Sequence, residues 1–90
     1  MNRKDADDME EVLRNFIVEN FLAAAGLDEF GNDDSFMEKG IIDSTGILEL
    51  LEFIEETFSI RVEDEEVITD NLDSLNKLKS FIKRKTGHAG

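Results

Sequence analysis

Apolar side chains recur every three or four residues in three separate segments of this chain, and no proline interrupts any of them. That spacing places the apolar side chains on one face of an α-helix, where they can be buried together. An alternating pattern typical of a strand is confined to residues 59–62. We therefore expect an all-α fold, namely a small antiparallel four-helix bundle of three longer helices and one short helix.

The first half of the chain is expected to form one long helix and one long loop. The helix should cover residues 5–25 and end at Gly26, because glycine readily adopts the left-handed conformation that closes a helix. A loop over residues 28–43 follows, with a short helical turn near residues 35–39. Its apolar side chains should pin it to the core: Phe30, Phe36, Met37, Ile41 and Ile42.

The second half is expected to hold the other three helices. One should cover residues 44–58, and an extended link should join it to a brief helix over residues 64–68. Ser74 should cap the last helix, which is expected to end at Gly87. The inward-facing residues of the bundle are expected to be Phe16, Ile17, Leu50, Ile54, Phe58, Leu75, Leu78 and Ile82.

Chain length and residue usage limit the architecture further. Ninety residues allow one domain with one small core, which we expect over residues 5–86 with a flexible tail at 87–90. The absence of cysteine removes disulfides and thiolate chemistry. No run approaches the roughly 18 apolar residues of a membrane span, and the polar segment Met1–Glu11 does not resemble a signal peptide. We therefore expect a cytoplasmic protein.

The charge balance of the chain is strongly acidic, with 22 acids, 10 bases and a net charge of −12. Nucleic acid is a poor partner because its phosphates would be repelled, whereas basic protein surfaces would be attracted. Residues 40–73 contain eleven acids and a single base, Arg61, and we interpret this acidic middle as a recognition surface. Five bases gather between Lys77 and Lys85, where they complement the negative end of a helix dipole.

The usual catalytic constellations are missing from the sequence. The only histidine is His88, and the chain has no cysteine, so we expect no hydrolytic triad. Acidic and amide side chains crowd one loop: Asp28, Asn32, Asp33 and Asp34. Their spacing does not match that of a calcium-binding EF-hand. We therefore expect neither an enzyme nor a specific metal site, and a metal buffer is the weakest of the alternatives.

Ser44 stands where the long loop meets the second long helix, directly after Asp43. Either residue can cap that helix, but Asp43 can do so alone, and Ser44 would then point outward as an exposed nucleophile. Gly46, in the first turn, weakens the helix by about 1 kcal/mol relative to alanine. Because we expect no core contact for Gly46, we interpret it as bare backbone that lets a partner approach, or as a residue tolerated near a frayed end.

The residues around and beyond Ser44 match a known pattern along most of the chain. The matching segments are Gly40-Ile41-Ile42-Asp43-Ser44-Thr45, Glu49-Leu50-Leu51, Glu55-Glu56, Phe58-Ser59-Ile60-Arg61-Val62, Asp64-Glu65-Glu66-Val67 and Asn71-Leu72-Asp73-Ser74-Leu75. With them, the chain resembles the acyl carrier and peptidyl carrier proteins from about Val12 to Lys85.

The resemblance implies a role for Ser44, next to Asp43. It implies that this serine carries 4'-phosphopantetheine through a phosphodiester, and that the thiol of the arm holds an acyl or aminoacyl group as a thioester. A carrier of this kind is a monomer that does no chemistry itself and delivers its cargo to enzymes. The implied partners are a phosphopantetheinyl transferase, an acyl- or aminoacyl-activating ligase, and downstream acyl-processing enzymes with basic docking surfaces.

The implied docking residues lie on the helix that follows Ser44, and they are Thr45, Leu48, Glu49, Glu52 and Glu56. Four of them follow at spacings of four, three and four residues, which places them opposite the inward-facing stripe. The chain departs from the family at Thr45, where leucine is usual, and it differs from typical fatty-acid synthase carriers at Gly46 and Glu52. We interpret it as a stand-alone carrier loaded by a dedicated ligase; the alternative is an acidic helical interaction module that is never modified.

Overall fold

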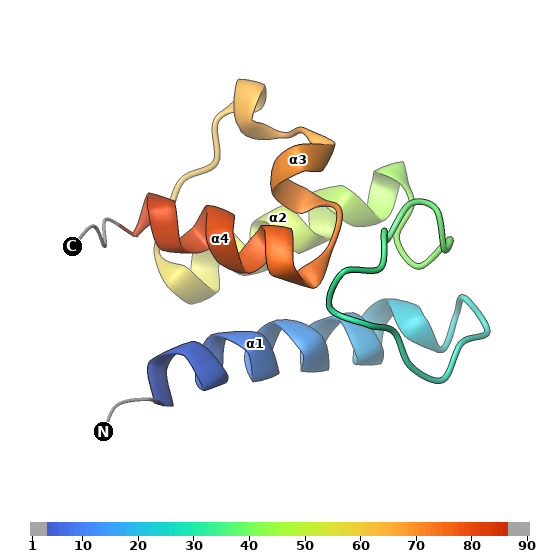
Figure 1. Cartoon of the computed structure of the whole chain (residues 1–90). Coiled ribbons are helices and arrows are strands. Elements are labelled where there is room, and N and C mark those ends of the chain that lie inside the picture. The colour runs from blue at the N-terminus through green and yellow to red at the C-terminus, as the bar shows by residue number, and fades with distance from the viewer. Residues whose placement is uncertain (1–3, 87–90) are drawn as a thin grey trace.

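The computed structural model describes the chain over residues 4–86, and its regular structure within these bounds is all helical (Figure 1). That range contains four α-helices and no strand, and the helices are α1 (Lys4–Ile17), α2 (Ser44–Phe58), α3 (Thr69–Leu72) and α4 (Leu75–Lys85). The predicted all-α class, with three longer helices and one short one, is confirmed. The expected helix end at Gly87 and the tail at 87–90 lie outside the described residues.

The helices are arranged so that the beginning of α2 lies beside the long loop. In Figure 1, α1 runs along the bottom of the molecule, α2 and α4 lie above it, and α3 lies near the top. Helix α4 contacts both α1 and α3. The loop passes around the right-hand side of the view, from the end of α1 to the first turn of α2.

The first helix does not continue as an α-helix to residue 25, as the sequence predicted. Helix α1 ends at Ile17, and a π-helical segment follows over Val18–Leu22. Two bulky neighbours within it, Phe21 and Leu22, are both buried. The wider turn of a π-helix accommodates this adjacent pair, which the spacing of a regular α-helix does not anticipate.

Gly26 closes this first helical segment as predicted. Its φ is +78°, in the left-handed region. Its N–H donates to the Ala23 carbonyl, and the N–H of Leu27 donates to the Leu22 carbonyl. These two hydrogen bonds make a Schellman motif, in which the residue after the glycine folds back against the last turn.

The loop that follows is held on the core, as expected, by four buried side chains: Phe30, Phe36, Ile41 and Ile42. Met37 is the exception, because its side chain is 47% exposed. The short helical turn expected near residues 35–39 is present as one helical hydrogen bond, from the Lys39 N–H to the Ser35 carbonyl at 3.0 Å, within turns over residues 36–40. It extends no further because the Gly40 N–H donates three residues back, to Met37, and the φ of Gly40 is +70°.

Helix α2 begins and ends at the predicted residues, and a non-helical link follows it. Ser59 ends the helix with a left-handed φ of +57°. The N–H groups of Ser59 and Ile60 both donate to the Glu55 carbonyl. The Glu55 carboxylate then accepts the Val62 N–H at 2.8 Å, so this one acid of α2 is used to hold the link.

The brief helix expected over residues 64–68 is wrong in its extent. A 3-10 turn covers Asp64–Glu66, closed by a capping box between Glu63 and Glu66. Ile68, the second of three consecutive β-branched residues, has extended backbone with φ −134° and ψ 158°, a conformation that such side chains favour. The short helix α3 therefore starts only at Thr69.

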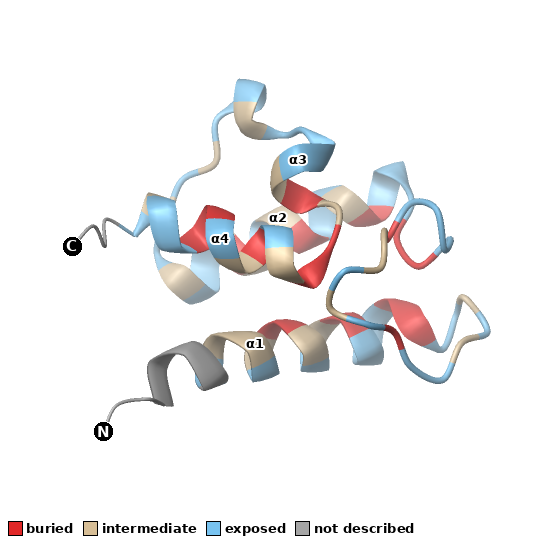
Figure 2. Ribbon diagram, viewed as in Figure 1, coloured by how far each residue is buried: buried red, intermediate tan, exposed pale blue. Residues whose placement is uncertain are grey.

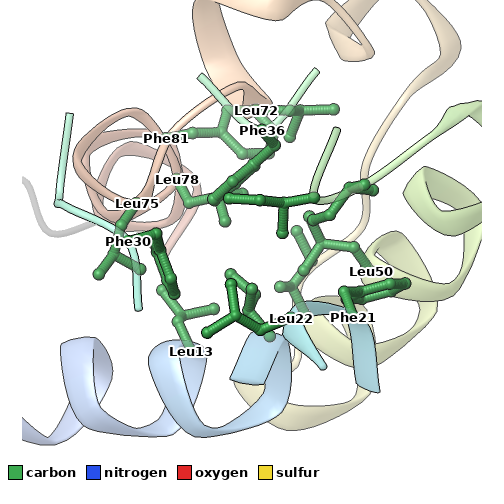
Figure 3. Packing of buried hydrophobic residues seen from close by; sticks show 14 of the residues in the cluster. Leu13, Phe21, Leu22, Phe30, Phe36, Leu50, Leu72, Leu75, Leu78 and Phe81 are labelled. Atoms are coloured by element: carbon green, nitrogen blue, oxygen red, sulfur yellow. The ribbon is translucent and has the colours of Figure 1, made fainter. Parts of the chain in front are cut away.

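Helix α4 starts as predicted, because the Ser74 hydroxyl accepts the Lys77 N–H at 3.1 Å. Its apolar stripe joins α1, α2 and the long loop in one core (Figures 2 and 3). Six of the expected core residues are fully buried: Ile17, Leu50, Ile54, Leu75, Leu78 and Ile82. Phe16 and Phe58 also face the core, but they are only half-buried and pack against its edge.

Polar side chains of α1 also bind the long loop and α4, and the sequence did not predict these contacts. The Arg14 guanidinium donates to the Phe30 carbonyl at 2.9 Å and lies 4.6 Å from the centre of the Phe30 ring. Lys79 of α4 forms an ion pair with Glu10 at 2.7 Å. At the other end of α4, Lys85 pairs with Glu66 at 2.8 Å.

Because of these two ion pairs, the free energy of unfolding depends on pH. The hydrogen bond and charge of Lys79 outweigh partial burial and lower the pKa of Glu10. The pKa of Glu66 is lowered by the Glu63 N–H and then by Lys85. Because each folded pKa lies below its unfolded value, the stabilisation is complete above the usual glutamate pKa of about 4.3 and is lost as pH falls through the folded pKa.

We therefore predict that Glu10→Gln lowers the thermal midpoint at neutral pH, and that the difference from the parent vanishes on acidification below the usual glutamate range. The difference should be at most a few degrees, because partly exposed ion pairs contribute little. Thermal unfolding followed by circular dichroism at several pH values measures it. Glu11→Gln, an exposed neighbour that loses the same charge, should show a smaller difference. Equal differences for the two variants at every pH would contradict the contribution of the Lys79 pair.

Candidate functional site

Ser44 is the first residue of α2, and its neighbour Asp43 performs the capping. Asp43 has extended backbone, and its Oδ1 accepts the Gly46 N–H at 2.8 Å. The Asp43 carbonyl also accepts the Ile47 N–H at 3.0 Å. The predicted division of roles is therefore confirmed for the cap, and the Ser44 side chain is exposed.

The chain just before Ser44 is fixed to the core. Ile41 and Ile42 are 4% and 1% exposed. The N–H groups of both donate to the carbonyl of Phe36, at 2.8 and 3.3 Å. An exposed hydroxyl thus follows directly after a buried, hydrogen-bonded segment, so its position is set by the core.

Gly46 contradicts the interpretation made from the sequence, because it is buried and packed. A Cβ built on Gly46 would lie 2.9 Å from Cε1 of Phe21 and 3.0 Å from Cγ2 of Ile42. Real Cβ atoms essentially never come within 3.0 Å of such an atom. Glycine fits here because the first turn of α2 packs closely against Phe21. This contact could not be anticipated from local pattern, since Phe21 lies 25 residues away in the chain.

An apolar groove of about 300 Å³ lies beside Ser44. Its apolar lining comes from three separate segments, and consists of Met37, Ile47, Leu48, Val67, Ile68 and Leu72, with Ser44, Thr69 and Asp73 as the polar members. Four of these large side chains are unusually exposed: Leu48 at 62%, Ile68 at 48%, Met37 at 47% and Val67 at 39%. Of these lining residues, the sequence analysis predicted only Ser44 and Leu48 as parts of a functional site. The adjacent apolar pair Val67-Ile68, within an acidic segment, was the available sign of an exposed apolar surface.

Asp73 fixes one wall of this groove. Its carboxylate accepts the Met37 N–H at 3.0 Å and the Ser35 hydroxyl, and its backbone carbonyl accepts the Phe36 N–H at 3.1 Å. The turn that carries Met37 is thereby joined to the connection between α3 and α4. The Asp73 carboxylate therefore holds this wall of the groove through hydrogen bonds that it already makes.

The predicted docking residues on α2 are all exposed: Thr45, Leu48, Glu49, Glu52 and Glu56. They extend from the first turn, which carries Ser44, to the last turn of the helix. A second hollow of about 660 Å³ adjoins this face; it shares Leu48 and Val67 with the groove and also includes Glu52, Glu55 and Asp64. The exposed side of α2 therefore combines carboxylates with apolar side chains.

The carboxylates of the acidic loop over residues 28–34 do not converge on one point. Asp34 accepts the Gly31 N–H at 2.7 Å and lies 3.9 Å from the Lys39 ammonium. Asp33 instead accepts the side-chain amide of Asn76 in α4 at 2.7 Å. Across the part of the chain that the structure describes, no three or more histidine, cysteine or acidic side chains come together as a metal site would require.

Sequence comparisons do not place the chain in a family. No protein-family model matches it, and a search of curated proteins finds no significant match. Within residues 4–86, no helix has both the length and the apolar character needed to cross a membrane.

Proposed function

We propose that this chain is an acyl carrier protein, modified on Ser44 with 4'-phosphopantetheine, that presents a thioester-bound cargo to partner enzymes. The observation that carries the proposal is the environment of Ser44. Its hydroxyl is exposed, and Asp43, not Ser44, caps the helix. The preceding residues are anchored in the core, and an apolar groove lies beside the serine. A hydroxyl in this setting can be reached by a modifying enzyme while the carrier remains folded.

The residues around Ser44 fit the proposed group chemically. A phosphodiester at the first residue of a 15-residue helix is favoured by the positive end of the helix dipole. During transfer, Ser44 Oγ would bond to the pantetheine-bearing phosphorus of coenzyme A, the pyrophosphate bond would break with release of adenosine 3',5'-bisphosphate, and the transferase would take the hydroxyl proton. When attached, the group supplies the thiol that holds the cargo.

The lining of the groove favours an apolar acyl cargo over an aminoacyl cargo. An ammonium group placed there would lose water against a mostly apolar lining, with Asp73, whose carboxylate already accepts hydrogen bonds from Ser35 and Met37, as the one acidic residue of the lining. Apolar atoms of an acyl chain would instead cover side chains that are otherwise exposed to water. We further infer that the helices form the antiparallel bundle of carrier proteins, with α2 as the presenting helix, and that the carrier works as a cytoplasmic monomer without catalytic activity of its own.

Intact mass measurement tests the proposal. The purified chain is incubated with coenzyme A and a phosphopantetheinyl transferase of broad specificity. We expect the mass to increase by one phosphopantetheine group, and peptide mapping to locate it on Ser44. An unchanged mass, under conditions in which a control carrier is fully converted, would contradict the proposal and favour the unmodified interaction module.

The acidic face of α2 should guide the transferase to Ser44. We predict that the double variant Glu49→Lys, Glu52→Lys slows transfer by about tenfold or more at low salt and largely removes its salt dependence, since electrostatic steering raises association rates by about 10–10³. Folding should be little affected, because exposed substitutions typically change stability by within about 0.5 kcal/mol. Initial rates over a range of sodium chloride concentrations measure the effect.

The matched control reverses two exposed acids that belong to the first helical segment and not to α2. Glu11→Lys, Glu19→Lys makes the same change in net charge, and we expect it to keep most of the parental rate. If both double variants slowed transfer equally, net charge and not the α2 face would be responsible, and this docking surface would be wrong.

A further inference from the structure

The space that a side chain at position 46 would need is filled by the aromatic ring of Phe21, from another part of the chain. A Cβ at this position would be 2.9 Å from Cε1 of Phe21, 3.0 Å from Cγ2 of Ile42 and 3.3 Å from Oδ1 of Asp43. The last of these atoms is the capping oxygen that accepts the Gly46 N–H. A single added methyl group would therefore press on the ring, on the anchored residue before the cap, and on the cap itself.

Phe21 is poorly able to move away from that methyl group. It lies in the π-helical segment, is 9% exposed, and belongs to the buried cluster shown in Figure 3. Its ring contacts the Phe16 ring edge to face, with centroids 5.7 Å apart. Phe16 in turn stacks on Phe53 of α2, with centroids 4.0 Å apart. The contacts therefore run from Gly46 of α2 through Phe21 and Phe16 of the first helical segment to Phe53, which is again on α2.

Ser44 lies in the same helical turn as Gly46, two residues before it. Its position is therefore fixed from both sides: Ile42 anchors the chain before it, and the contact with Phe21 anchors the turn after it. A residue larger than glycine would lift the first turn of α2 from Phe21 and displace the hydroxyl. The exposed carboxylates later on α2 would be displaced less, because Phe16 and Phe53 still hold the middle of the helix.

We infer that Gly46 and Phe21 are positioning residues that set the location of the Ser44 hydroxyl for phosphoryl transfer; this inference rests on the function proposed above. The need is geometric. Reacting atoms must be aligned closely, and a displacement of about 1 Å can reduce a rate about 10²-fold. Disturbing the contact between Gly46 and Phe21 should therefore lower the kcat of transfer. The KM for the carrier should be nearly unchanged, because the docking face is intact.

Steady-state transfer kinetics with purified transferase and labelled coenzyme A test this inference. We expect Gly46→Ala to lower kcat by about tenfold or more, with KM within about twofold of the parent. Phe21→Leu, Gly46→Ala removes the ring edge that the methyl group meets, and should recover most of the lost kcat. The matched control is Gly31→Ala, whose added Cβ meets its nearest neighbour, Asp34, at an ordinary 3.4 Å; it should behave as the parent.

The outcomes separate the inference from the proposed function. If the parent chain is not modified at all, the proposed function fails. If the parent is modified and Gly46→Ala shows the parental kcat, or raises KM alone, the positioning role is overturned while the function stands. Helicity and the thermal midpoint are measured for each variant, and rates are expressed per folded protein. Should Gly46→Ala unfold, the double variant decides: a folded double variant with impaired kcat overturns the inference, and recovery supports it.

Discussion

Replacing Ser44 with alanine should abolish the uptake of label from coenzyme A completely and leave the fold unchanged. The side chain is exposed and Asp43 alone makes the cap hydrogen bond to Gly46, so the substitution removes the nucleophile without removing a structural contact. Transfer of labelled phosphopantetheine, followed by intact mass and circular dichroism, measures both properties. The expected result is no detectable labelling and a helical signal equal to that of the parent.

The other serines provide the control for this prediction. Ser35 donates to Asp73, Ser74 is buried as the cap of α4, and Ser59 has a left-handed backbone. Ser80 is exposed on α4 and is the matched comparison, so Ser80→Ala should be labelled at the parental rate. Labelling of the Ser44 variant would show that the attachment site lies elsewhere in the chain.

Truncating the buried stripe of α2 should produce the largest loss of stability. Leu50 and Ile54 are both 0% exposed, and replacing such a residue with alanine costs about 2–5 kcal/mol. The whole stability of a domain is only about 5–15 kcal/mol, so Leu50→Ala or Ile54→Ala should be substantially unfolded or strongly sensitive to urea. Urea unfolding followed by circular dichroism gives the free energy of unfolding for each variant.

Leu48→Ala is the internal comparison for these variants. It removes the same atoms from the same helix, but its side chain is 62% exposed, so the free energy of unfolding should change by less than about 0.5 kcal/mol. An unfolding midpoint unaffected by Leu50→Ala and Ile54→Ala would mean that the buried face of α2 has been identified incorrectly.

The features that sequence reasoning predicted correctly are those determined by nearby residues. The bounds of α2 follow from the Asp43 cap and from the end of its own apolar stripe near Phe58. The end of the first helical segment at Gly26 and the start of α4 at Ser74 likewise depend on hydrogen bonds within a few residues. Such contacts are specified locally, and a single sequence is enough to anticipate them.

Two of the features that were missed depend on packing in the tertiary structure. The π-helical segment allows Phe21 and Leu22 to be buried together, and Gly46 is small because Phe21 lies against it. Neither the joint burial of Phe21 and Leu22 nor the contact between Phe21 and Gly46 can be predicted from local residue propensities. Ser44 and the acidic face were identifiable because they are exposed on one helix, whereas the groove combines residues from three segments whose proximity only the tertiary structure provides. The attachment role of Ser44 itself stays a prediction.

Because Asp73 makes three hydrogen bonds to the Ser35–Met37 turn, we expect one wall of the groove to be stiffer than the other. On one side, Met37 moves with the connection between α3 and α4, because Asp73 holds the Ser35–Met37 turn through both its carboxylate and its carbonyl. On the other side, Val67 and Ile68 lie in non-helical backbone between a 3-10 turn and α3. A bulkier cargo should therefore be accommodated by yielding of residues 67–68, with the loop wall acting as a fixed stop.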